Sequence, residues 1–384
     1  MTAMPIDGGT APQLPRHIPD IDALREHLQA AVELEHATIP PYLCGLYTIR
    51  DGHNRAAAEI IRTVAVQEML HMVLAANVLN AVGGAPSIDR PDFVYAYPAE
   101  LPVGAHGPIT VALQKFSPAA IETFLAIEAP APALQLKAAP GLEAMAEPPR
   151  IPPGQLREML RRGEVYPSIG DFYQAIEQGL VALELLAQGR SDGTIFTGDH
   201  DRQVTSEYYY NSGGAVVTVT DLASALEALK IIVEQGEGFE HGVDDDDRGM
   251  FRQPSEAAHY YRFKQIAYGR YYQSDDDPDQ PPTGADFPVD HSAAAVFDMI
   301  DNPSVGAFPA GPVRDQATAC AQSYTRLLAL IDRAVNGERD QLIPAVVQMF
   351  TLKAAAVALL NNPASPDGPA RAGPCFDYMP MDSH

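Results

Sequence analysis

Two long helix patterns follow each other near the start of the chain, over residues 19–49 and 54–82. In both, apolar side chains recur every three or four residues, which is the spacing of one face of an α-helix. The intervening residues 51–54 (DGHN) are typical of a turn, and Gly83-Gly84 ends the second pattern. Because helices joined by so short a turn pack antiparallel, the chain is predicted to contain a long helical hairpin.

The rest of the chain is also predicted to be mainly helical. Further helix patterns cover 117–128, 169–188, 221–238, 254–272, 313–335 and 340–361, and a short strand is predicted over 215–220. The last two helices form a second hairpin around Asn336-Gly337.

This pattern predicts a mainly α fold with three parts. Residues 1–18 are a lead-in, and residues 19–272 form a four-helix bundle that includes a long crossover insertion over 85–220. Residues 273–384 are a loop and a C-terminal helical hairpin packed on the bundle.

The charge and the cysteines limit the class of protein. With 26 basic and 50 acidic residues the net charge is −24, which argues against nucleic acid and against anionic membranes as partners. No run of 18 uncharged apolar residues and no signal-peptide pattern occur. The three cysteines (Cys44, Cys320 and Cys375) lie far apart, which favours a reducing compartment. We therefore expect a cytoplasmic protein without a membrane or nucleic-acid partner.

Three polar residues interrupt the apolar faces of the first two helices. Glu68 and His71 lie in the middle of the second helix's apolar face, and Glu35 lies at the centre of the first helix's apolar stripe. Unpaired, each would be costly to bury. Glu33 and His36 have the same E-x-x-H spacing, but Glu33 points to the opposite side, so we interpret that match as coincidence.

A second set with the same spacing occurs later in the chain. Glu256 and His259 repeat E-x-x-H, and the preceding helix ends in IVEQGEG. There Glu237 lies about 60° and Glu234 about 120° from the centre of the apolar stripe. The glycines around Glu237 weaken the assumption of a regular helix, so both glutamates stay candidates.

The repeated pattern of one glutamate followed by Glu-x-x-His favours a metal centre. Residues three apart share a helix face, so each E-x-x-H offers a metal one oxygen and one nitrogen. Four carboxylates and two imidazoles match two cations, with iron or manganese favoured by the oxygen-rich donors. A single E-x-x-H is usually structural, and only the repetition favours metal. Glu177 lies too far from its helix's apolar face, and Asp244–Asp247 lack the spacing of a calcium loop.

Several segments resemble one known family. LEHATIPPYLCGLYTI (34–49), VAVQEMLHMVLAANVLNAVGG (64–84), SIGDFYQAIEQGL (168–180), IIVEQGEG (231–238) and EAAHYYRFKQIAYGR (256–270) are similar to the ferritin-like domain of the iminophenylpyruvate dimer synthases of violacein and rebeccamycin biosynthesis. The resemblance implies a ferritin-like bundle. It supports Glu35, Glu68, His71, His259 and either Glu234 or Glu237 as metal ligands.

Two functions follow from these observations. The first is an oxidoreductase that uses two iron or manganese ions and oxygen or peroxide on a small-molecule substrate. If the resemblance to the family includes its substrates, this molecule is derived from an aromatic amino acid. The alternative is a non-catalytic metal-binding or structural protein. The family's pathway enzymes are much longer chains, so this chain resembles their ferritin-like part standing alone. The sequence also permits a homo-oligomer.

Two further features remain open between alternatives. Pro40-Pro41 predicts either a kink beside the metal site or a helix break. Tyr42, Tyr260 and Tyr261 either serve a radical near the site or simply pack, and packing is favoured.

Overall fold

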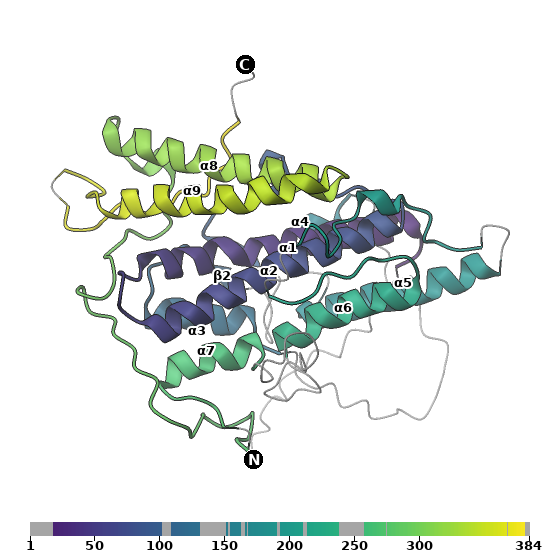
Figure 1. Ribbon diagram of the computed structural model, residues 1–384, viewed down its shortest axis with the longest axis horizontal. Coiled ribbons are helices and arrows are strands. Elements are labelled where there is room, and N and C mark those ends of the chain that lie inside the picture. Colours follow the sequence, from purple (N-terminus) through teal and green to yellow (C-terminus); the bar gives the residue numbers. More distant parts are fainter. Residues whose placement is uncertain are drawn as a thin grey trace, which may run out of the picture.

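Two long antiparallel helices, α1 (Ile21–Thr48) and α2 (Arg55–Ala81), form the centre of the molecule (Figure 1). The computed structural model describes residues 18–101, 109–130, 151–152, 154–162, 166, 168–189, 193–209, 213–237, 257–273, 275–366 and 368–380, with backbone alone at 161 and 237. Asp20 caps α1 by accepting a hydrogen bond from the Ala23 amide at 2.9 Å. The predicted hairpin is confirmed.

Helix α1 runs through Pro40 and Pro41 without a break. Proline at position 41 has no amide hydrogen for the carbonyl of Ala37, one turn earlier. The Tyr97 hydroxyl replaces that donor and lies 2.6 Å from the Ala37 oxygen. The alternative of a helix break is therefore wrong, because a side chain from outside the helix satisfies the carbonyl that proline leaves unpaired.

Helices α1 and α2 form two of the four columns of the bundle. Each of the other two columns consists of two shorter helices. Helices α3 (Pro118–Ile127) and α5 (Ile169–Gln188) both contact α1, while α6 (Leu222–Glu237) and α7 (His259–Tyr268) both contact α2. Helix α3 also packs on α7 at one end of the molecule, and α5 packs on α6 at the other (Figure 1). The two columns are therefore interrupted midway along α1 and α2.

The C-terminal hairpin of α8 (Pro312–Val335) and α9 (Leu342–Leu360) covers the opposite face of α1 and α2 (Figure 1). His36 on α1 and Tyr324 on α8 are 2.7 Å apart at the imidazole Nε2 and the hydroxyl. The Asn80 side chain on α2 donates to the carbonyl at the end of α8 at 2.7 Å. The predicted four-helix bundle with a crossover insertion and a C-terminal hairpin is confirmed, while the domain boundaries stay a prediction.

Smaller elements differ from the prediction. The insertion contains α4 (Leu156–Arg161) and an antiparallel pair of strands, β1 (Ala99–Leu101) and β2 (Ile109–Val111), none of which was predicted. No strand forms over 215–220, where the Gln203 side chain bonds both the amide and the carbonyl of Val219. Helix α7 ends at Tyr268, earlier than predicted, because Gly269 adopts a left-handed conformation. Short 3₁₀ turns lie at Pro91–Phe93, His200–Arg202, Val305–Ala307 and Arg339–Gln341.

By length and composition alone, two of the described helical segments could cross a membrane. One is α2, whose most apolar stretch is 89% buried inside the protein, so it is a core helix. The other is Arg339–Leu360, whose most apolar stretch is 28% buried. Its α9 part exposes Ile343, Val347 and Phe350. The expected absence of a membrane partner and the cytoplasmic location stay predictions.

Candidate metal centre

Five buried side chains meet where the two columns are interrupted. Glu35 comes from α1, and Glu68 and His71 come from α2. Glu128 directly follows the last residue of α3, and His259 is the first residue of α7. None of the five residues is more than 8% exposed.

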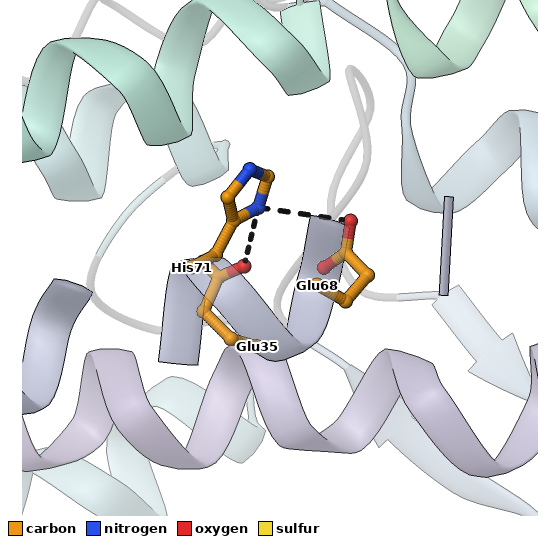
Figure 2. A group of neighbouring side chains, drawn as sticks. All are labelled: Glu35, Glu68 and His71. Carbon is orange, nitrogen blue, oxygen red and sulfur yellow. Dashed lines mark ion pairs between the residues drawn. The ribbon is translucent and has the colours of Figure 1, made fainter. Parts of the chain in front are cut away.

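Glu35, Glu68 and His71, which we call group A, lie on the two continuous helices (Figure 2). The His71 Nδ1 atom is 3.3 Å from Glu35 Oε2 and 3.8 Å from Glu68 Oε1. Figure 2 shows Glu35 reaching across from α1 toward the imidazole, with Glu68 beside it on α2. The three ligand atoms lie within 4.8 Å of one another, close enough to bind one metal ion.

Glu68, Glu128 and His259, which we call group B, make a second cluster of the same kind. The His259 Nδ1 atom is 3.0 Å from Glu68 Oε1 and 3.3 Å from Glu128 Oε2. The same oxygen of Glu68 therefore lies near both imidazoles. A carboxylate shared in this way can bridge two ions.

The donor atoms of the two groups are arranged favourably for binding cations but unfavourably for contact with one another. Three carboxylates face each other in a buried space, which is unfavourable unless protons or cations balance them. The His259 Nδ1 atom is buried and has no hydrogen bond within the described part of the chain, because neither carboxylate contact has hydrogen-bond geometry. A metal ion between these atoms would satisfy them all.

Each of the five side chains is held by a hydrogen bond with a neighbour. The carboxylates accept from hydroxyl groups, and the imidazole Nε2 atoms donate to glutamine side-chain oxygens. The pairs are Tyr173 with Glu35, Tyr42 with Glu128, Thr38 with Glu68 (3.0 Å), Gln235 with His71 (2.9 Å) and Gln67 with His259 (3.2 Å). Such outer contacts orient metal ligands.

When no cation is present, the surroundings of group A favour the protonated forms of Glu68 and His71. Burial, and then the charge of Glu128, raise the pKa of Glu68 well above its ordinary value. Burial lowers the pKa of His71, but its contact with Glu35 and the charges of both group A carboxylates outweigh burial, and the net direction is upward. For Glu35, burial raises the pKa, yet His71 and Tyr173 together hold it below its ordinary value. A metal would therefore displace protons from Glu68 and His71.

The two tyrosines remain hydrogen-bond donors. Burial, and then the charge of Glu128, raise the pKa of Tyr42, while burial and the charge of Glu35 raise that of Tyr173. Both hydroxyls therefore keep their protons at neutral pH. The sequence leaves Tyr42 open between a role near the site and simple packing, and in the structure its hydroxyl bonds Glu128 of group B.

A small cavity of about 40 Å³ adjoins both groups. Apolar side chains from four helices form much of its wall: Leu34, Ile127, Ile169, Ile232 and Val233. The space has room for about two or three water molecules, so in this conformation it does not admit an organic substrate.

The structure brings four of the seven predicted residues together: Glu35, Glu68, His71 and His259. Glu234 belongs to neither group, and its carboxylate lies 3.4 Å from the Lys230 ammonium group. Gln235, the next residue along α6, faces His71 instead. The Glu237 side chain and Glu256 lie outside the described residues, as does the Asp244–Asp247 loop.

Glu128 was missed in the sequence, although a signal for it exists. It follows Ile121 by seven residues and Phe124 by four, and both are buried. It therefore lies on the apolar face of α3 extended by one residue. The same face calculation that identified Glu35 would have identified Glu128 too.

The Glu33/His36 pair of α1 belongs to neither group, in line with its interpretation as a coincidental E-x-x-H match. Glu33 pairs with Arg90 and Arg157, and His36 faces the C-terminal hairpin through Tyr324. Tyr260 and Tyr261 pack edge to face, with ring centres 5.3 Å apart. Their packing role, favoured from the sequence, agrees with this contact.

The chain is similar to a known family, to a known enzyme and to a solved structure. A family model described as ferritin-like matches residues 28–268. The dichlorochromopyrrolate synthase of Lentzea aerocolonigenes is 28% identical over 211 residues, which are 53% of this chain and 18% of that protein. The chain thus spans less than a fifth of this relative. The crystal structure of a ferritin-like protein from Caulobacter vibrioides superimposes with a TM-score of 0.55 at 20% identity, over 89% of this chain and 96% of that one.

Proposed function

Because the chain belongs to the ferritin-like family, we propose that groups A and B hold two metal ions and that the protein is an oxidoreductase. One observation carries the proposal: two Glu/His clusters share the Glu68 carboxylate, each with its ligand atoms within 4.8 Å of one another. Ferritin-like proteins build dinuclear sites from inward glutamates and Glu-x-x-His pairs on helices. This chain has the same kinds of donor in the same kind of core.

The donors favour iron or manganese. The described ligands are three carboxylates and two imidazoles, an oxygen-rich set that suits these ions better than soft metals. Glu237 and Glu256, predicted from the sequence, stay proposed as further ligands.

The chain's own residues would orient the metal ligands and limit the access of water to the site. Tyr173 and Tyr42 keep the outer carboxylates turned inward, and Thr38 holds the shared one. The apolar side chains of the cavity wall would limit the access of bulk water to the site. When bound, two such ions supply the electrons that reduce oxygen or peroxide, a chemistry that the cofactor carries.

The proposed substrate is a small molecule derived from an aromatic amino acid. This part of the proposal is supported by the similarity to dichlorochromopyrrolate synthase and to the dimer synthase family, with which the chain shares its ferritin-like part. The cavity of about 40 Å³ admits a molecule of the size of dioxygen. An organic substrate requires the site to open on its cavity side.

Elemental analysis of the purified protein, after anaerobic loading with iron(II) or manganese(II), tests the metal site. We expect about two ions per chain in the wild type and near-complete loss in Glu68→Ala, which removes the shared ligand. Glu33→Gln is a matched control, because Glu33 is equally buried on α1 but pairs with arginines. Retention of both ions in Glu68→Ala would contradict the proposal.

A non-catalytic metal-binding role is the alternative, and the small size of the cavity favours it. Oxygen uptake by the reduced, iron-loaded protein separates the two functions. Rapid uptake with a transient visible absorption band supports the oxidoreductase. Slow uptake without a band supports the non-catalytic protein.

A further inference from the structure

We propose that a second pocket, which we call the aromatic pocket, binds a small organic ammonium ion that carries an aromatic ring. The pocket has a volume of about 450 Å³, which is within the range of small-molecule sites. It lies between residues 91–97 of the insertion and residues 376–378 after α9, and Leu113 and residues 302–304 complete its lining. None of the described residues that line it belongs to group A or group B, so the inference does not depend on the proposed function.

Aromatic side chains form the walls of this pocket. Tyr95 and Tyr97 come from the insertion, and Phe376 and Tyr378 come from the C-terminal segment. Aromatic rings offer apolar contact to another ring, and their faces attract a cation. The walls therefore suit a ligand that combines an aromatic ring with a positive charge.

A single carboxylate gives the aromatic pocket its charge. Asp377 lies between Phe376 and Tyr378 in the sequence, and no lysine, arginine or histidine occurs among the described lining residues. The Asp377 Oδ2 atom accepts a hydrogen bond from the Val305 amide at 3.1 Å. A carboxylate has the capacity to accept further hydrogen bonds, and an ammonium group supplies both the hydrogen and the opposite charge. The net charge of −24 favours a cation in the same direction.

The same charge disfavours anionic ligands. An aromatic acid would bring its own carboxylate beside Asp377, and the described lining has no basic side chain to balance the two charges. Like charges held together out of bulk water are costly. The aromatic pocket should therefore bind an aromatic amine in preference to an aromatic acid of the same size.

The walls are held in place by contacts with the rest of the fold. The Tyr97 hydroxyl donates to a carbonyl of α1 at 2.6 Å, and the Tyr378 hydroxyl donates to the Asp89 carboxylate at 2.9 Å. The Phe376 ring packs edge to face on Tyr324 of α8, with ring centres 5.2 Å apart. Because these side chains are already ordered, a ligand loses little free energy in ordering them.

Isothermal titration calorimetry with three probes of similar size tests the proposal. All three carry the same phenol ring: tyramine has an ammonium group, 4-ethylphenol is neutral, and 3-(4-hydroxyphenyl)propionate has a carboxylate. We expect tyramine to bind about 10–100-fold more tightly than 4-ethylphenol, because a hydrogen bond to a charged group contributes more than a neutral contact. The propionate should bind most weakly. Equal affinities for tyramine and 4-ethylphenol, or no detectable binding of tyramine, would overturn the proposal.

Two variants assign the binding to this pocket. Asp377→Asn keeps an oxygen for the Val305 amide but removes the charge, so it should lower the affinity for tyramine to that for 4-ethylphenol and leave 4-ethylphenol unchanged. Asp340→Asn removes the same charge from an exposed 3₁₀ turn outside the pocket and is the matched control.

Tyr378→Leu removes one aromatic wall and should weaken the binding of both tyramine and 4-ethylphenol. Circular dichroism checks that the variant folds like the wild type. If Asp377→Asn binds tyramine as tightly as the wild type does, the pocket does not recognise a cation. If folded Tyr378→Leu binds both probes unchanged, the ligand lies elsewhere, and the proposal is wrong in that case too.

Discussion

Two buried histidines should make the metal-free fold sensitive to acid. His27 and His36 lie on α1, and each is 3% exposed. Burial lowers the pKa of His27 from 6.5 to about 4, although a bond to the Ala23 carbonyl opposes it. Burial also lowers the pKa of His36 from 6.5 to about 3. Both are neutral in the folded protein at pH 5, whereas in the unfolded chain both would be protonated.

The sign and size of the effect follow from these values. A depressed folded-state pKa means that the stabilisation is complete above pH 6.5 and is lost as the pH falls from 6.5 toward 4 and 3. Between pH 7 and pH 5 each histidine should lower the free energy of unfolding by about 2 kcal/mol, because one pKa unit corresponds to about 1.4 kcal/mol.

Urea unfolding at pH 7 and pH 5, with chelator present, measures the loss. In His36→Gln the loss between the two pH values should be smaller than in the wild type by about 2 kcal/mol, whatever the variant's stability at pH 7. Substitution of the exposed His53 by glutamine is the control and should leave the loss unchanged. The reasoning is refuted if His36→Gln loses as much stability as the wild type.

Three further predictions concern other parts of the molecule. Metal affinity should rise with pH, since the raised pKa values of Glu68 and His71 mean that binding releases their protons; titrations at pH 6 and pH 8 that agree would contradict this. Tyr97→Phe should lower the free energy of unfolding by about 1–3 kcal/mol by leaving a buried carbonyl of α1 unpaired, measured by urea unfolding. Gly198→Ala should lower the free energy of unfolding by about 1–3 kcal/mol or more, because the added methyl would lie 1.8 Å from a backbone oxygen of α2. The control is Gly306→Ala, whose added methyl meets nothing within 4 Å and should leave the melting temperature nearly unchanged.

The part of the site that lies on regular helices could be predicted from the sequence. The positions of Glu35, Glu68 and His71 follow from the 3.6-residue repeat, because α1 and α2 are long, continuous and apolar on the inward side. Glu128 was missed although the helix predicted over 117–128 includes it, because the apolar face of this short helix in a proline-rich insertion was not calculated. The choice between Glu234 and Glu237 could not be made from helix angles near the glycines of α6, and in the structure Gln235 contacts His71.

The interrupted columns could not be predicted at all. The sequence indicates α3, α5, α6 and α7 as separate helices, but which of them lie end to end depends on packing against α1 and α2. Local signals locate helices, whereas the pairing of four short helices into two columns is decided by contacts between residues far apart in the chain.

The burial of α1 on two sides has a consequence for how the protein opens. Every residue from 30 to 45 is buried, because the columns cover one side of the helix and the C-terminal hairpin covers the other. Amides in such a helix exchange with deuterium only when the whole protein unfolds, whereas helix ends exchange through local opening. Glu35 is thus expected in the slowest-exchanging unit, while Glu128 and His259 lie at helix ends, which are expected to open earlier. One half of the metal centre would then persist through local fluctuations in which the other half comes apart.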